Sequence, residues 1–133
     1  MTPRAKWPSG VEKTLALPEQ PLAANLIASA RRFAQRTAII FHGAHYDYQT
    51  LLDRVEKLSG YFQHSQGLKP GDRVLLFMQN SPQFIISYYA ILHAGGVVVP
   101  VNPMSRSAEL DYICSDTGAK IICLGAELCE VVA

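Results

Sequence analysis

The stretch at residues 69–103, KPGDRVLLFMQNSPQFIISYYAILHAGGVVVPVNP, constrains the fold more than any other part of the chain. Its apolar run at 74–78 does not alternate with polar residues, which predicts a strand buried on both faces. The tripeptide NSP at 80–82 predicts a helix start, and GG at 95–96 ends that helix directly before a second apolar run at 97–99. These signals predict a βαβ unit, and therefore a parallel sheet with a right-handed crossover.

Further helices and strands are predicted on both sides of this unit. Gly43-Ala44 suits the two-residue type II′ turn of an antiparallel hairpin, because glycine accepts a positive φ at the first central position. We therefore predict an α/β fold: a partial three-layer sheet of mostly parallel strands with helices on both faces, preceded by a small hairpin. The predicted elements are a helix at 22–36, hairpin strands at 38–41 and 45–48, helices at 49–64 and 107–117, a third parallel strand at 120–124 and the start of a helix after 125.

Two segments are expected along the chain. Residues 1–21 contain four prolines and predict an extended arm, with Trp7 as its anchor. Residues 22–133 predict one α/β subdomain. The last helix stops before it has the length to pack, so we expect this subdomain to be truncated at its C-terminal end; a natural stop there is the alternative.

The central helix of the βαβ unit is apolar around most of its circumference. Only Gln83 and Ser87, four residues apart, interrupt the apolar surface as a narrow polar ridge. A helix of this kind is expected to be covered on more than one side.

Composition excludes several classes of protein. A formal net charge of +1, from 12 basic and 11 acidic residues, gives no field for a polyanion, so we expect no nucleic-acid partner. No apolar run reaches the roughly 18–20 residues of a transmembrane helix, and the N-terminus lacks a signal-peptide core. Three cysteines without CxxC spacing indicate buried, inert thiols and a cytoplasmic location; they are Cys114, Cys123 and Cys129.

No catalytic constellation is evident in these residues. The glycines at 95–96 follow a helix, whereas a dinucleotide-binding GxGxxG opens one, and neither GxxxxGK[ST] nor GxSxG occurs. His42 and His45 lack a third ligand at a supporting spacing, so we predict no metal site. Three arginines at 31–36 fit either an anion site or, more simply, a solvated helix end with favourable dipole contacts.

The order of these signals resembles one enzyme superfamily. AIIFHGAHYDYQTLLDRVEKLSGYF, GLKPGDRVLLFMQNSPQFIISYYAILHAGGVVVPVNP and AELDYICSDTGAKIIC are similar to the N-terminal part of acyl- and aryl-adenylating enzymes, which include acyl-CoA synthetases, luciferases and peptide-synthetase adenylation domains. The resemblance covers most of residues 22–124. The matching residues are Tyr48, Leu51, Gly71, Asp72, Val74, Asn80, Ser81, Pro82, Ala94, Gly95, Pro100, Asn102, Pro103, Glu109, Leu110, Asp116, Gly118, Ala119 and Lys120.

Within that superfamily, the arm with Trp7-Pro8 and the VPVNP sequence look most like those of bacterial medium- and long-chain fatty acid–CoA ligases. The resemblance implies a parent enzyme that uses ATP to convert a fatty acid or other carboxylate into an acyl-adenylate and pyrophosphate. The acyl group then passes to the thiol of coenzyme A, and Mg²⁺ balances the phosphate charge. A cytoplasmic location and a homodimer are expectations for this parent.

The catalytic segments of the family do not occur in this sequence. These are the Ser/Thr/Gly-rich phosphate loop that ends in PKG, the YG-x-TE segment, the TGD aspartate and a lysine of the C-terminal domain. No catalytic residue is therefore assigned. We expect residues 1–133 alone to be inactive and to hold no cofactor, whereas the parent enzyme would use ATP, Mg²⁺ and coenzyme A.

The resemblance implies one set of binding candidates. In some CoA-forming relatives the loops at positions corresponding to 102–106 and 125–127 approach the coenzyme. Asn102, Ser105 and Arg106 are the named candidates for a position near CoA. The alternative is that these residues serve only as turn and cap residues, which their types also suit.

Three other interpretations remain open from the sequence. The first is another adenylating enzyme of the same superfamily. The second is a free-standing flavodoxin-like or receiver-like module, since repeated βα units suit both; however, HGAH at 42–45 does not supply a flavodoxin phosphate loop. The third is a segment that serves only as a packing or oligomer surface in its parent.

Overall fold

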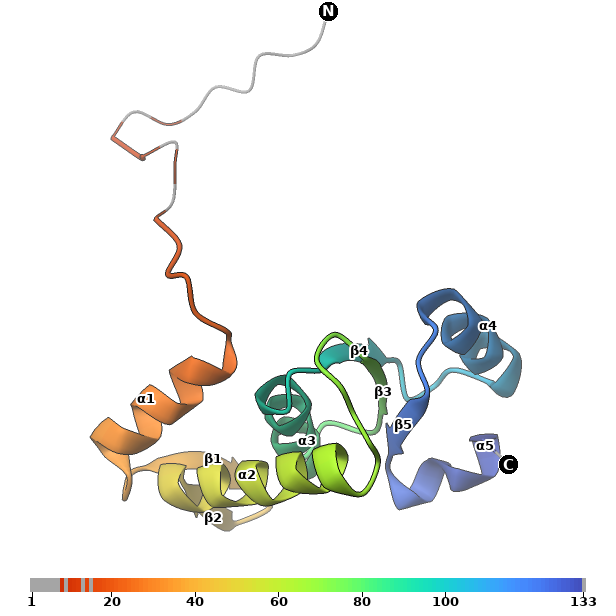
Figure 1. The fold of residues 1–133 in the computed structure, drawn as a ribbon. Helices are drawn as coiled ribbons and strands as arrows, with labels where there is room; N and C mark the ends of the chain where they lie inside the picture. Colours follow the sequence, from red (N-terminus) through yellow and green to blue (C-terminus); the bar gives the residue numbers. More distant parts are fainter. Residues whose placement is uncertain (1–7, 9, 13, 15, 133) are drawn as a thin grey trace, which may run out of the picture.

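The computed structural model describes residues 8, 10–12, 14 and 16–132 (Figure 1). The predicted anchor Trp7 lies outside them. The described residues before Pro21 include no helix or strand. The elements, in order, are α1 (Ala23–Phe33), β1 (Thr37–Phe41), β2 (Ala44–Asp47), α2 (Tyr48–His64), β3 (Arg73–Phe77), α3 (Pro82–His93), β4 (Val97–Val101), α4 (Ser107–Thr117), β5 (Ile121–Leu124), a 3₁₀ turn η1 (Ala126–Leu128) and α5 (Cys129–Val132).

The predicted parallel sheet is confirmed. Its strand order is β4-β3-β5, and Leu75 of the central strand pairs with Val99 on one side and Ile122 on the other. The central position explains the uninterrupted apolar run, because residues 74–77 have no exposed surface. Each apolar side chain of this size contributes about 1.5–3 kcal/mol when it is fully buried.

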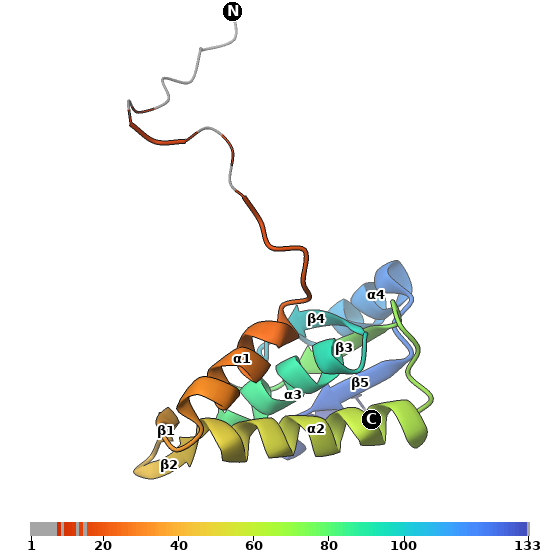
Figure 2. The same ribbon diagram turned by 60° about the vertical axis from the view of Figure 1, so that its left-hand side comes forward.

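Helices cover both faces of this sheet, which confirms the three-layer prediction (Figure 2). On one face, Val74 packs in a core with residues of α1, α2 and α3. On the other face, Leu75 and Phe77 pack with Leu110 of α4 and Leu128 of the η1 turn. The two cores are separated only by the sheet, so β3 contributes alternate side chains to each.

The hairpin is confirmed, but its predicted turn is wrong. Phe41 pairs with Ala44, so the two-residue loop is His42-Gly43 and not Gly43-Ala44. Both loop residues have positive φ, 46° for His42 and 80° for Gly43. Positive φ at both positions defines a type I′ turn, whose twist matches that of the strands.

The first turn of α2 is tied to the end of α1. Asp47 caps α2 through its carboxylate, which accepts a hydrogen bond of 2.7 Å from the Thr50 N–H. The Tyr48 N–H donates to the Arg36 carbonyl at 3.1 Å, and the Gln49 N–H donates to the Ala34 carbonyl at 3.0 Å. The free donors of one helix end are thereby satisfied, and α1 and α2 are fixed side by side.

The central helix α3 has the predicted start. Ser81 caps it by accepting a hydrogen bond of 3.2 Å from the Phe84 N–H, and Pro82 occupies the first turn. The predicted polar ridge is wrong, however, because Ser87 is buried against β5 whereas Gln83 is exposed. The reason is position along the helix: Gln83 lies at the carboxyl edge of the sheet, and one turn later Ser87 lies over it.

No helix in the described part of the chain is long and apolar enough to cross a membrane.

Candidate functional site

The carboxyl ends of the three parallel strands carry the loops that the sequence singled out. β3 leads into the cap at 78–81, β4 into the loop at 102–106, and β5 into residues 125–127. Ligands of open α/β sheets bind outside this edge, so it is the first candidate site.

Asn102, Ser105 and Arg106 all lie in the loop that joins β4 to α4. The Asn102 side-chain oxygen accepts a hydrogen bond of 3.0 Å from the Met104 N–H, and its carbonyl accepts one of 2.9 Å from the Ser105 N–H. These bonds form a tight turn of the Asx type. Asn102 is exposed and Ser105 is half-buried. Their contacts in the chain are thus those of turn residues, and the predicted proximity to CoA stays a prediction.

Arg106 stands at the start of α4. Its N–H donates a hydrogen bond of 2.9 Å to the Glu109 carboxylate, which is the carboxylate half of a capping box. Glu109 also lies in the first helical turn, where the helix dipole favours a negative charge. The Arg106 side chain is exposed, so its guanidinium is available to an external anion.

A hollow of about 350 Å³ lies between the ends of β3 and β5. The Gly125 N–H donates to the Phe77 carbonyl at 3.0 Å, which ties the loop after β5 to the end of β3. A Cβ at position 125 would collide with the Glu127 carboxylate, so glycine lets that carboxylate fold back over the loop. The lining residues are Met78, Gln79, Ser81, Gln83, Leu124, Gly125, Ala126 and Glu127.

Titratable side chains do not assemble into a reaction centre in the part of the chain that the structure describes. No group of three or more His, Cys, Asp or Glu residues that could hold a metal ion occurs there. The His93 ring lies 3.1 Å from the Ser59 hydroxyl, but Ser59 is only 2% exposed and is therefore out of reach of a substrate. This pair joins α3 to α2.

The thiols differ in their surroundings. Burial raises the pKa of Cys123, while a hydrogen bond of 3.5 Å to the Ser87 hydroxyl opposes that shift. Cys123 and Cys114 are both half-buried, as a packing role requires. Cys129 is exposed, so the prediction that all three cysteines are buried is wrong for this residue.

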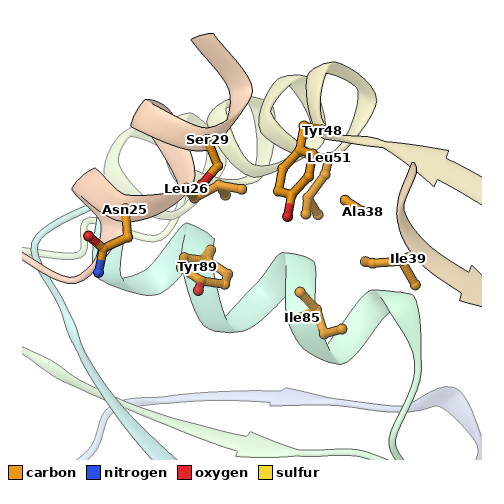
Figure 3. A pocket seen from close by; sticks show the side chains of 9 residues that line it. All are labelled: Asn25, Leu26, Ser29, Ala38, Ile39, Tyr48, Leu51, Ile85 and Tyr89. Carbon is orange, nitrogen blue, oxygen red and sulfur yellow. The ribbon is translucent and has the colours of Figure 1, made fainter. Parts of the chain in front are cut away.

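A second pocket was not foreseen from the sequence (Figure 3). It lies between α1, the hairpin, the start of α2 and α3, and it is lined mainly by apolar side chains. Its residues come from four separate elements, so no motif along the sequence predicts it. The lining residues are Asn25, Leu26, Ser29, Ala38, Ile39, Tyr48, Leu51, Ile85 and Tyr89.

Comparison with known proteins agrees with the fold. The family model described as AMP-binding enzyme matches residues 26–133. The long-chain-fatty-acid–CoA ligase of Bacillus subtilis (strain 168) is 39% identical over 118 residues, which are 89% of this chain and 21% of that protein. The enzyme of the same name from Salmonella typhimurium is 37% identical over 94 residues, or 71% of this chain and 17% of that protein.

A solved structure of related fold is the Klebsiella oxytoca NpsA N-terminal subdomain in complex with anthranilyl-AMSN. It superimposes with a TM-score of 0.72 at 27% sequence identity, covering 77% of this chain and 26% of that one. The chain spans about a fifth of the length of the curated relatives above. Because the family model covers most of the residues, the chain belongs to the AMP-binding enzyme family.

Proposed function

We propose that this chain is the N-terminal part of an ATP-dependent, AMP-forming fatty acid–CoA ligase. The observation that carries the proposal is the 39% identity to the Bacillus subtilis ligase over 89% of the chain. The longer enzyme would join a fatty acid to AMP with release of pyrophosphate, and would then transfer the acyl group to coenzyme A.

In this proposal the described residues supply the scaffold. The sheet with its two apolar cores positions the carboxyl-edge loops, and the catalytic side chains belong to the rest of the enzyme. ATP and Mg²⁺ would be held there also. The 133-residue chain alone is expected to be inactive.

Asn102, Ser105 and Arg106 are proposed to lie near coenzyme A in the longer enzyme. Support comes from their place after β4, at the edge of the sheet where ligands of such folds bind. The exposed guanidinium of Arg106 suits the phosphate groups of the coenzyme. We further propose a cytoplasmic enzyme, whose fatty acid, ATP and CoA substrates meet there, with a homodimer as its assembly.

Pyrophosphate exchange tests the proposal. The longer protein is expected to incorporate labelled pyrophosphate into ATP only when a fatty acid is present, and to form an acyl-CoA when CoA is added. Pyrophosphate exchange by the longer protein that does not depend on fatty acid would refute the ligase assignment. Carboxylate-dependent exchange by residues 1–133 alone would refute their expected inactivity.

A second candidate is another adenylating enzyme of the same family. The likeness to the NpsA subdomain, whose structure holds anthranilyl-AMSN, favours it. Such an enzyme would exchange pyrophosphate with an aryl or amino acid and would form no fatty acyl-CoA. Membership of the AMP-binding family favours either enzyme over a free-standing flavodoxin-like module.

A further inference from the structure

The pocket of Figure 3 has a volume of about 370 Å³. Tyr48 descends from the start of α2 into the space between α1 and the hairpin, while Ile85 and Tyr89 of α3 form the floor. A second hollow of about 270 Å³ adjoins it, because Ile39 and Ile85 line both. The combined space is of the size that small organic ligands occupy, which is roughly 300–1,000 Å³.

The walls are largely apolar. Leu26, Ile39, Leu51 and Ile85 line the first hollow, and Phe41 extends the apolar wall into the second. Among the described residues that line the two hollows, none is Lys, Arg, Asp, Glu or His. Moving a charged ligand from water into these hollows would therefore cost free energy, because no opposite charge would pair with it there.

Four polar side chains line the first hollow: the hydroxyls of Ser29, Tyr48 and Tyr89 and the amide of Asn25. Within the residues that the structure describes, none of these side-chain groups takes part in a hydrogen bond to another part of the chain. Each thus retains its capacity to donate or accept. Apolar walls with a few unpaired polar groups are typical of pockets that orient a small ligand.

We propose that this pocket binds a neutral amphipathic small molecule, of the class of a straight-chain alcohol. The alkyl chain would lie against Leu26, Ile39 and Ile85, and the hydroxyl would exchange hydrogen bonds with Tyr48 or Ser29. The site is separate from the carboxyl-edge loops and does not depend on the proposed ligase activity.

The test is a titration of 1-octanol into the ¹⁵N-labelled 133-residue chain, followed by amide chemical shifts. Saturable shifts are expected at Ile39, Tyr48 and Tyr89. Ser29→Leu fills the pocket and should weaken binding at least tenfold. Its matched control is Ala28→Leu, which adds the same side chain at an exposed position of α1 and should leave binding unchanged. Dispersed spectra of both variants establish that they are folded.

Two further measurements define the chemistry. Tyr48→Phe keeps the ring and removes one hydroxyl, so it should weaken octanol binding roughly threefold to tenfold, the value of one hydrogen bond. Octanoate at neutral pH should bind at least tenfold more weakly than octanol, because the described residues that line the pocket offer its carboxylate no cation.

Three results would overturn the proposal. The first is octanol binding that Ser29→Leu leaves intact, and the second is octanoate binding at the same amides with equal or higher affinity. The third is octanol binding by the 133-residue chain that is lost in the longer protein proposed above, which would identify the pocket as an internal packing surface. None of these results bears on ligase activity, so the two proposals fail separately.

Discussion

The Cys123 thiol of β5 donates a hydrogen bond of 3.5 Å to the Ser87 hydroxyl of α3, beside the apolar core on that face of the sheet. Ser87 is only 4% exposed. This contact joins α3 to the sheet, and it distinguishes Ser87 from Gln83, another polar residue of the helix.

Leucine at these two positions should have unequal effects. Ser87→Leu adds volume to a packed layer and is expected to lower the free energy of unfolding by about 1–3 kcal/mol. Gln83→Leu changes an exposed side chain, so its free energy of unfolding should stay within about 0.5 kcal/mol of that of the unsubstituted protein. Urea unfolding of both variants measures the difference. Equal losses would mean that α3 is rotated from the orientation described.

The thiols should react in the order of their exposure. Cys129 is exposed and should be alkylated first by iodoacetamide at pH 8. Cys123 should react slowly, because burial raises its pKa above the ordinary 9.0 and keeps it protonated. Peptide mass spectrometry after timed quenching measures the order. The same raised pKa makes the contribution of Cys123 to stability fall as pH rises above 9.0, and Cys123→Ala should remove that part of the pH dependence.

The cap of α2 should make stability depend on acid pH. Hydrogen bonds from Thr50 lower the pKa of Asp47 below its ordinary 3.8. The cap therefore stabilises the fold fully above pH 3.8, and the benefit is lost as pH falls through the lowered pKa. Asp47→Ala should lower Tm at pH 7. Asp47→Asn should retain most of the stabilisation by the cap, because the amide oxygen can also accept the hydrogen bond. Thermal unfolding at pH 7 and below 3.8 measures both effects; a variant profile parallel to the parent's would argue against the cap.

Two glycines should respond to alanine with opposite signs. Gly60 lies within α2, where a Cβ would meet only the His64 ring at 4.0 Å, so Gly60→Ala should stabilise the fold by about 0.5–1 kcal/mol. A Cβ at Gly96 would lie 3.0 Å from the Ile91 methyl and 3.1 Å from Leu68. Gly96→Ala should therefore destabilise by about 1–3 kcal/mol. Chemical denaturation of the pair checks the signs, and stabilisation by both changes would show that the α3–β4 junction has room.

Arg106 offers a test of the proposed CoA contact in the longer enzyme. Arg106→Ala should raise the KM for CoA about threefold to tenfold through loss of a charge-assisted bond, with pyrophosphate exchange unchanged. The N–H of residue 106 would still bond to Glu109, so α4 should remain capped. Arg31→Ala, at the exposed end of α1, serves as the charge-matched control. An unchanged KM for CoA would leave Arg106 with a capping role only.

The elements themselves followed from local signals. Apolar runs, the NSP cap and the glycine stop at 95–96 act within a few residues of one another, so β3, α3 and β4 lie where the sequence indicated. The hairpin turn lies one residue earlier than predicted, because His42 adopts a positive φ of 46°, which is uncommon for residues other than glycine. Local preference favoured Gly43-Ala44, and the pairing of Phe41 with Ala44 decided otherwise.

The candidate site was only partly visible in the sequence. Asn102 and Arg106 could be placed after a strand because motif order fixes their position along the chain. The pocket of Figure 3 could not be predicted from the sequence, because its residues come together only after four elements pack. Examples are Asn25, Ile39, Tyr48 and Tyr89.

The sequence by itself determined the elements, their order and the parallel sheet of the central βαβ unit, because strand burial, helix caps and glycine stops are short-range effects. Only the tertiary structure decided which polar side chains are buried and where cavities remain. Ser87 is the clearest instance: the same helix places Gln83 in solvent and Ser87 against Cys123, since the sheet ends between them. Burial of this kind depends on where one element crosses another, which spacing along a single chain does not encode.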